Sequence, residues 1–262
     1  MAKYIFTDRN GVYIIDLEKT LQHLLRACEY LKGIAEEAGV VLLVGTKRQA
    51  QDAILDAAQR TGMPFVNQRW LGGMLTNFET IRKSVARLEE IEKMETEGTY
   101  QFLTKKEVAM LKTQREKLLK VLVGVRNMKK LPSALFVVDP KQEEIAVLEA
   151  RRLDIPVVAI IDTNCDPDLI DHPIPGNDDA IRSVKLICDV IAKALIEGRS
   201  KYLQLHAEPE VEPTFDDEQP RILTAEEIAE ELEEKVASKL VDREVAKPKA
   251  KKTRVRKDSD VV

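Results

Sequence analysis

One feature restricts the fold of this chain more than any other. Short, wholly apolar runs alternate with longer segments in which apolar residues recur every three or four positions, as on one face of a helix. Parallel strands that are covered by helices on both faces read as such continuous apolar runs. The expected strands are residues 40–44, 64–66, 133–138, 156–162 and 173–174, and the expected helices are residues 21–35, 47–60, 142–153 and 178–197. Strands that alternate with helices indicate βαβ units. We therefore predict an α/β fold in which helices sandwich a parallel sheet.

A β-hairpin is expected before this alternation begins. The β-prone runs at residues 4–6 and 12–15 flank a turn in which Asn10 and Gly11 tolerate the positive φ angles of a tight connection. Gly39 is expected to end the helix that follows.

Residues 77–127 interrupt the alternation, because they carry no strand signal. A first arm has apolar side chains at helical spacing from Phe78 onward, and a second arm opens with Thr104 and Glu107 at the spacing of a capping box. The second arm follows a heptad seam of Val108, Leu111, Arg115, Leu118, Leu122 and Val125. We expect an inserted antiparallel, coiled-coil-like helical hairpin, with two ordinary core helices as the alternative.

The last part of the chain differs in composition. Residues 201–262 carry 12 Lys and Arg against 16 Asp and Glu, whereas residues 1–200 carry 29 of each sign. We therefore divide the chain into an α/β domain (residues 1–76 and 128–200), the inserted hairpin (77–127) and a charged, mostly disordered tail (201–262). Thr224 and Glu227 could cap one short helix in that tail. Proteins that bind nucleic acid are usually basic, so the neutral balance of the first 200 residues argues mildly against such a function, although a neutral total is compatible with a basic face opposite an acidic one.

No catalytic constellation is found. Residues 45–48 (Gly-Thr-Lys-Arg) follow a strand and lead into a helix, where backbone N–H groups could hold a phosphate. The segment lacks both the GxxxxGK[ST] spacing of a P-loop and the GxGxxG of a dinucleotide fold. A flavodoxin-like nucleotide-binding enzyme or regulator is therefore the weaker alternative, and we expect no catalytic residue and no cofactor.

Metal binding is not expected either. Residues 162–166 imitate the start of a calcium loop, but Pro167 stands where Gly is needed and Pro173 where Glu is needed. A strand-end turn with side-chain-to-backbone hydrogen bonds explains the segment better. The remaining candidate ligands are scattered, with no zinc-site spacing: His23, His172, His206, Cys28, Cys165 and Cys188.

Two further groups of polar and thiol side chains have structural explanations. Cys28 and Cys188 fall on apolar helical faces and are expected in the core. Residues 177–179 (Asn-Asp-Asp) stand at a predicted helix start, where such side chains cap N–H groups.

Local basic clusters are the remaining functional signal, because Lys and Arg bind phosphates and aromatic or guanidinium planes stack on exposed bases. Such groups occur at the turn after residue 44, beside the Gly72-Gly73 pair, and at the base of both hairpin arms. The candidate RNA-binding residues are Lys47, Arg48, Arg69, Trp70, Arg82, Lys83, Arg87, Arg126, Lys129 and Lys130.

Four separated motifs carry a family resemblance. Residues 69–77 (RWLGGMLTN) resemble the signature of the second small-subunit ribosomal protein family, in its bacterial type. Residues 4–17, 44–48 (VGTKR) and 175–182 (PGNDDAIR) also resemble that family, in the right order. The inserted hairpin resembles the bacterial and organellar branch, and residues after about 200 match nothing general.

The resemblance implies a flavodoxin-like α/β domain with a coiled-coil hairpin, and a structural constituent of the small ribosomal subunit that supports translation. Its implied partners are 16S ribosomal RNA and other small-subunit ribosomal proteins, including the large, messenger-binding first protein. It implies no enzymatic activity and no small-molecule substrate.

The chain departs from the family at its start. Members usually begin with a helical segment, a His-Phe-Gly-His stretch and a Trp-Asn-Pro element, which are absent before the hairpin at residues 4–15. We interpret Met1 as a start assigned too late, which would remove part of the RNA-contacting surface. No run approaches about 18 apolar residues, so no membrane partner is expected. The ribosome of the cytoplasm is the expected location, and the stroma or matrix of an organelle stays open.

Overall fold

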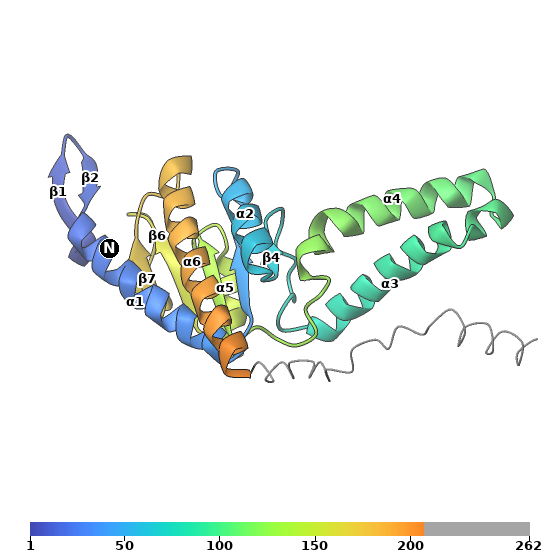
Figure 1. Ribbon diagram of the computed structural model, residues 1–262. Coiled ribbons are helices and arrows are strands. Elements are labelled where there is room, and N and C mark those ends of the chain that lie inside the picture. Colours follow the sequence, from blue (N-terminus) through green and yellow to red (C-terminus); the bar gives the residue numbers. More distant parts are fainter. Residues whose placement is uncertain (207–262) are drawn as a thin grey trace, which may run out of the picture. The chain divides into compact units, whose positions relative to one another are not determined.

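The computed structural model describes residues 1–206 and contains a five-stranded parallel sheet (Figure 1). The strand order is β4-β3-β5-β6-β7, and all four neighbouring pairs are parallel. The strands are β3 (Val41–Val44), β4 (Phe65–Val66), β5 (Ala134–Val138), β6 (Val157–Ile161) and β7 (His172–Pro175). Numbered along the sheet, this is the 2-1-3-4-5 order of flavodoxin-like folds. The predicted α/β fold with a parallel sheet is therefore confirmed.

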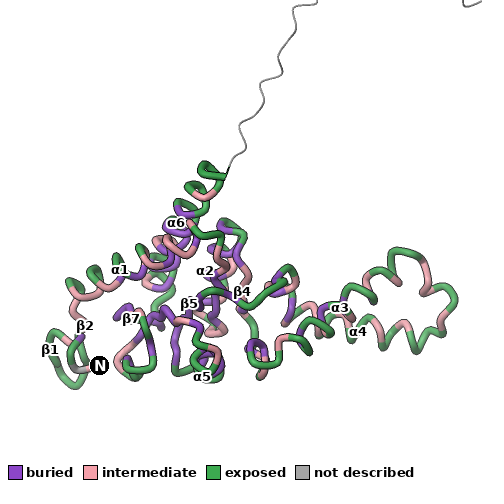
Figure 2. Tube along the Cα trace, turned by 90° about the horizontal axis from the view of Figure 1, so that it is seen from below, coloured by how far each residue is buried: buried purple, intermediate pink, exposed green. Residues whose placement is uncertain are grey.

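Helices cover both faces of the sheet, which explains why its central strands are apolar throughout. Every residue of β3, β5 and β6 is buried. Alternate side chains enter two separate clusters: Leu43 lies in the first and Leu42 in the second. The first cluster includes α1 (Leu17–Glu36), α2 (Gln51–Thr61) and α6 (Ile181–His206), and the second includes α5 (Glu144–Arg152) and the base of the helical hairpin. Figure 2 shows the buried residues gathered around the strands.

A two-stranded antiparallel sheet precedes this domain. Strands β1 (Ile5–Arg9) and β2 (Val12–Ile15) are joined by Asn10 and Gly11, whose φ angles are 54° and 77°. These positive angles are those of the tight turn that the Asn-Gly pair predicted. A short 3-10 helix, η1 (Ala2–Tyr4), leads into β1.

The end of α1 differs from the prediction in detail. The helix ends at Glu36, and Ala38 rather than Gly39 takes the left-handed conformation, with φ of 56°. The N–H of Gly39 donates to the carbonyl of Ile34 at 2.8 Å, as in a Schellman motif. Gly39 is required there for space, because a Cβ atom would lie 2.5 Å from Ile34 Cγ2.

The inserted segment forms the predicted helical hairpin. Helices α3 (Phe78–Thr96) and α4 (Lys105–Leu122) are joined through η2 (Thr99–Phe102), and η3 (Val123–Val125) follows α4. Thr104 and Glu107 form the expected reciprocal capping box. The predicted seam of α4 is half-buried or buried along its length, and its one polar member, Arg115, forms an ion pair with Glu95 of α3.

Several helix boundaries differ from those predicted. A hydrogen-bonded turn over residues 48–50 separates β3 from α2, so this helix begins at Gln51 rather than near residue 47. Helix α6 begins at Ile181 and continues to His206, through residues that the sequence assigned to the tail. Lys201 in this extension pairs with Glu36 at 2.9 Å. The remainder of the predicted tail, including the helix suggested by Thr224 and Glu227, lies outside the described residues. No helix within residues 1–206 is both long and apolar enough to cross a membrane.

Candidate RNA-binding surface

The carboxylate of Glu149 organises the loop that carries the RWLGGMLTN motif. Glu149 comes from α5, and its Oε1 accepts hydrogen bonds from Trp70 Nε1 at 3.2 Å and Gly73 N at 2.7 Å. Its Oε2 accepts from Leu75 N at 2.9 Å and from the backbone N and the Oγ1 of Thr76 at 3.0 and 3.1 Å. Burial alone would raise the pKa of Glu149, but these hydrogen bonds outweigh it and lower that pKa below the usual value.

This arrangement separates the two RNA-binding candidates of the loop. Trp70 is only 8% exposed and packs in the second core cluster, so its ring supports the loop and offers no open face for stacking. Arg69, its neighbour, is exposed. The sequence did not identify Glu149, although its spacing from the buried Ala146 and Ala150 puts a carboxylate on the apolar stripe of α5.

The base of the helical hairpin brings three candidates into one groove. Arg82 of α3 lies there with Arg126 and Lys129, which follow α4, and the groove has a volume of about 480 Å³. Arg126 also pairs with two acids of α3, at 3.3 Å from Glu89 and 2.8 Å from Glu92. The positive charge of Arg126 is therefore compensated within the protein, whereas Lys129 forms no ion pair within residues 1–206.

A second groove, with a volume of about 630 Å³, adjoins the first through Lys129. Lys130 lines it, and so do Arg199 and Tyr202 of α6. The sequence missed Arg199 because the predicted helix stopped at residue 197. A longer reading of its apolar spacing would have placed this arginine on the helix.

Two further candidates lie on α3 but line neither groove. Lys83 is exposed, and Arg87 is half-buried and pairs with Glu90 at 2.6 Å. The structure thus gathers Arg82, Arg126, Lys129 and Lys130 at the base of the hairpin, with Lys83 and Arg87 along the same helix as Arg82.

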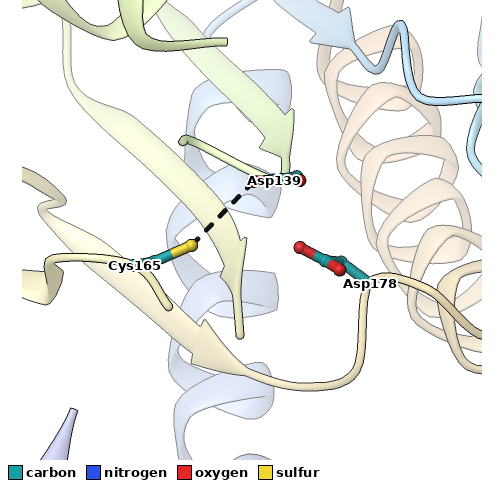
Figure 3. A group of neighbouring side chains, drawn as sticks. All are labelled: Asp139, Cys165 and Asp178. Carbon is teal, nitrogen blue, oxygen red and sulfur yellow. Dashed lines mark hydrogen bonds between the residues drawn. The ribbon is translucent and has the colours of Figure 1, made fainter. Parts of the chain in front are cut away.

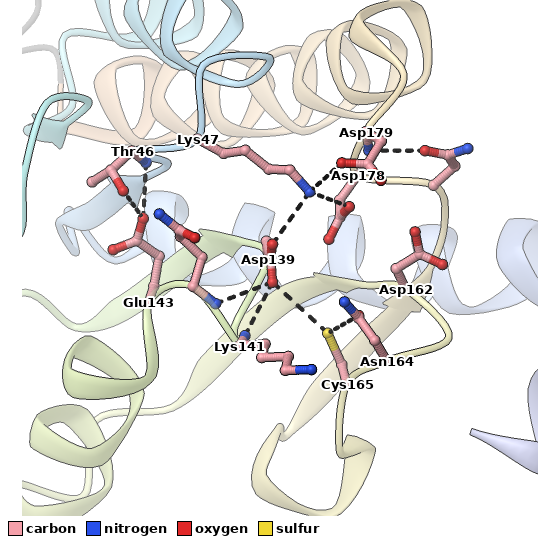
Figure 4. A network of polar contacts seen from close by, with 12 residues as sticks. Thr46, Lys47, Asp139, Lys141, Glu143, Asp162, Asn164, Cys165, Asp178 and Asp179 are labelled. Atoms are coloured by element: carbon pink, nitrogen blue, oxygen red, sulfur yellow. Dashed lines mark hydrogen bonds and ion pairs between the residues drawn. The ribbon is translucent and has the colours of Figure 1, made fainter.

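Lys47 lies apart from these residues, at the carboxyl ends of the strands (Figure 4). Its Nζ is 2.6 Å from Asp178 Oδ1, 2.6 Å from Asp179 Oδ1 and 3.3 Å from Asp139 Oδ2. Burial alone would lower the pKa of Lys47, but the hydrogen bonds that its ammonium group donates to Asp178 and Asp179 raise that pKa above its ordinary value. Its ammonium group is therefore engaged within the protein, whereas the neighbouring Arg48 is exposed.

The backbone of the same turn is not free to hold a nucleotide phosphate at Thr46. The backbone N–H of Thr46 donates to Glu143 Oε1 at 2.9 Å, and the Thr46 hydroxyl donates to the same oxygen. A nucleotide phosphate would have to displace Glu143 and approach the aspartates around Lys47. This electrostatic environment disfavours the nucleotide-binding alternative.

The polar groups before α6 do not cap this helix, contrary to the prediction. Asn177 Oδ1 accepts from the N–H groups of Asp179 and Ala180 at 2.8 and 2.9 Å, but both residues precede α6, so Asn177 stabilises the turn that leads into this helix and does not cap the helix itself. The capping expectation is also wrong for Asp178 and Asp179, because both carboxylates turn toward Lys47. An ion pair with a lysine 131 positions away is invisible to local spacing.

The predictions for the loop after β6 and for Cys188 are confirmed. The loop after β6 is held by side-chain-to-backbone hydrogen bonds, from Thr163 N to Asp162 Oδ1 at 2.6 Å and from Asp168 N to Asp166 Oδ1 at 3.1 Å. Cys188 is buried in the core, and burial raises the pKa of its thiol to about 12. Cys28, which was also expected in the core, is only half-buried and packs against the margin of the same cluster.

Comparison with models of known protein families identifies the family of this chain. The family model described as ribosomal protein S2 matches residues 1–198, a span that includes the two-stranded sheet, the parallel sheet, the helical hairpin and most of α6. The match therefore covers both the Glu149-centred loop and the basic base of the hairpin. On this basis, the chain belongs to the ribosomal protein S2 family.

Proposed function

We propose that this chain binds 16S ribosomal RNA through the basic base of its helical hairpin. Its family gives it a structural role in the small ribosomal subunit. The observation that supports the proposed surface is the convergence of Arg82, Lys129, Lys130 and Arg199 on two adjoining grooves. Lys and Arg placed against phosphates supply most of the affinity of such interfaces.

The local character of this surface agrees with the charge balance. Residues 1–200 carry equal numbers of acidic and basic side chains, so attraction to RNA must come from one basic region. Arg69 and Arg48 are exposed and are proposed as further phosphate contacts, together with Lys83 and Arg87. Lys47 and Trp70 are proposed to support the interface from within the protein, because one is held by carboxylates and the other is packed in the core.

Neighbouring small-subunit proteins, including the large messenger-binding first protein, are the proposed protein partners. Apolar side chains on β2, β1 and the first turns of α1 support protein contact, because Phe6, Tyr13, Leu17 and Leu21 are all more than half exposed. We propose no catalytic step for the chain, in keeping with a family of ribosomal proteins. Its proposed location is the ribosome, in the cytoplasm or in an organelle.

The experiment that tests the RNA-binding surface compares two double variants of the full chain. The first variant combines Lys129→Gln and Lys130→Gln and so removes two positive charges from the grooves. The second variant is the control: it combines Lys105→Gln and Lys106→Gln and removes two exposed positive charges from the start of α4. Binding to small subunits depleted of this protein is measured by gradient sedimentation over a range of salt concentrations.

The first double variant is expected to bind more weakly and to lower the slope of log affinity against log salt by about 2. The second variant is expected to match the wild type. Equal behaviour of the two variants would refute the assignment of RNA binding to the hairpin base.

A further inference from the structure

Acidic side chains from three loops gather where the parallel strands end (Figure 4). Asp139 follows β5, Asp162 follows β6, and Asp178 and Asp179 follow β7. Lys47 follows β3, the strand beside β5 in the sheet. In open α/β sheets, ligands bind outside the carboxyl ends of the strands, where the order of the strands reverses. Here that reversal falls between β3 and β5, where Lys47 and Asp139 lie, and the aspartates after β6 and β7 extend the cluster along the same carboxyl edge of the sheet.

The charges of this cluster are not balanced by the protein. Lys47 is the one cation within ion-pair distance of Asp139, Asp178 and Asp179 among the described residues. Asp162 belongs to no ion pair of residues 1–206, although it lies in the same group as Asp178 and Asp179. Three carboxylates therefore contact one ammonium group, and a fourth, that of Asp162, lies beside two of them without a cationic partner among the described residues.

Asp178 carries a buried carboxylate oxygen that has no partner among the described residues. The residue is only 1% exposed, and its Oδ1 accepts a hydrogen bond from Lys47 at 2.6 Å. Its Oδ2 is buried as well and receives no hydrogen bond from any described residue. A buried carboxylate oxygen without a partner is costly, and bound cations are one of the few ways in which proteins offset that cost.

One oxygen each from Asp162, Asp178 and Asp179 lies within 4.8 Å of the other two. The side chain of Asp179 is 69% exposed, which leaves an entry path and room for water ligands. Asp162 is oriented by the hydrogen bond that its Oδ1 accepts from Thr163 N at 2.6 Å. Carboxylates with remaining water ligands are the coordination that Mg²⁺ prefers. We propose that Asp162, Asp178 and Asp179 form a binding site for a hard divalent cation of the Mg²⁺ type.

A neighbouring group of possible ligands fits less well. Asp139, Cys165 and Asp178 also place one ligand atom each within 4.8 Å of the others (Figure 3). However, Asp139 Oδ1 already accepts hydrogen bonds from the backbone N–H groups of Lys141 and Gln142. Burial raises the pKa of the Cys165 thiol, which opposes the thiolate form that binds Zn²⁺. The oxygen-only group is therefore the better site.

The cation would hold the β6–η4 loop and the segment before α6 together at the sheet edge, where η4 is Pro167–Leu169. This role does not depend on RNA binding, because the ligands lie at the strand ends and not in the two grooves of the hairpin base. A chain that failed to bind ribosomal RNA would still be expected to bind the cation.

The test is a titration of the purified full chain with Mn²⁺, a paramagnetic probe for Mg²⁺ sites, followed by electron paramagnetic resonance. We expect one Mn²⁺ per chain that excess Mg²⁺ displaces, together with a rise in the thermal midpoint. Asp162→Asn, at a half-buried position, is expected to weaken Mn²⁺ binding by about tenfold or more. Asp178→Asn is expected to do the same. Asp168→Asn, an exposed acid of the same loop, is the matched control and should bind as the wild type does.

Circular dichroism establishes that each variant is folded, and Asp162→Asn keeps the test decisive if the buried Asp178→Asn variant does not fold. The proposal is overturned if the wild type binds no Mn²⁺ stoichiometrically, or if Asp168→Asn weakens binding as much as Asp162→Asn. It is also overturned if the chain binds Zn²⁺ more tightly than Mn²⁺ and Mg²⁺, and if Cys165→Ser abolishes this Zn²⁺ binding whereas Asp162→Asn does not.

Discussion

The indole Nε1 of Trp70 donates a hydrogen bond to Glu149 Oε1 at 3.2 Å, although 79 positions separate the two residues in the sequence. The same carboxylate also accepts hydrogen bonds from Gly73, Leu75 and Thr76. One side chain of α5 thus determines the conformation of the loop that presents Arg69. The most distinctive motif of the sequence owes its shape to a residue that lies outside it.

Replacing this carboxylate is expected to loosen the loop. Glu149→Gln puts an amide NH₂ group where only acceptors fit, and should lower the free energy of unfolding by about 1–3 kcal/mol. Trp70 is the only tryptophan, so its fluorescence reports this loop alone, and iodide quenching should increase in the variant. Glu144→Gln, on an exposed position of the same helix, should change neither quantity. Identical urea unfolding curves for both variants would contradict this role of Glu149.

The stabilisation by Glu149 should also depend on pH. Its folded-state pKa is lowered, so the stabilisation is present above the pKa of the unfolded chain, about 4.3, and is lost as the pH falls through the folded-state pKa. The difference in unfolding free energy between wild type and Glu149→Gln should therefore be largest near neutral pH and should shrink below about pH 4.3. Urea unfolding of both proteins at several pH values measures this difference in free energy. A difference that stays constant down to strongly acidic pH would contradict stabilisation by the ionised carboxylate of Glu149.

The crossing of α1 and α6 should not tolerate a methyl group. A Cβ atom on Gly198 would lie 2.5 Å from the carbonyl oxygen of Lys32 and 2.8 Å from Ala35 Cβ. Gly198→Ala should therefore destabilise the fold by about 1–3 kcal/mol. Gly33→Ala is the control, because nothing lies within 4 Å of its Cβ position in α1. That variant should stabilise by about 0.5–1 kcal/mol through helix propensity, and thermal unfolding would show both shifts.

Arg115, the one polar residue in the apolar seam of the hairpin, should be replaceable by an apolar residue. Arg115 pairs with Glu95 across the hairpin, but its Nε atom is buried without a hydrogen-bond partner among the described residues. Arg115→Leu restores the apolar heptad pattern and should leave the hairpin unchanged or stabilise it by up to about 1 kcal/mol. Lys112→Leu, at an exposed position of α4, should give no gain. A marked loss of stability in Arg115→Leu would show that the ion pair is a necessary part of the seam.

Local chemistry was enough to predict most of the fold. The apolar runs that became β3, β5 and β6, the Asn10-Gly11 turn and the Thr104 capping box are each determined by neighbouring residues, and the structure confirms them. Helix ends were less accurate, because the start of α2 and the far end of α6 depend on the turn after β3 and on contacts such as Lys201 with Glu36.

The candidate sites were harder to predict because their contacts join distant segments. Nothing near Trp70 indicates that its ring would be buried against α5, and nothing near Asp178 indicates Lys47. These pairs meet only because the topology brings the ends of parallel strands and the faces of helices together. Composition and spacing could identify which side chains carry charge, but not which charges the protein itself compensates.

Sedimentation of the tagged full chain from a bacterial lysate, at low and at high salt, tests the central claim most directly. A small-subunit protein held by phosphate contacts should migrate with small subunits at low salt and dissociate progressively as the salt concentration rises. Recovery only at the top of the gradient at low salt would contradict the account that this chain assembles into the small ribosomal subunit.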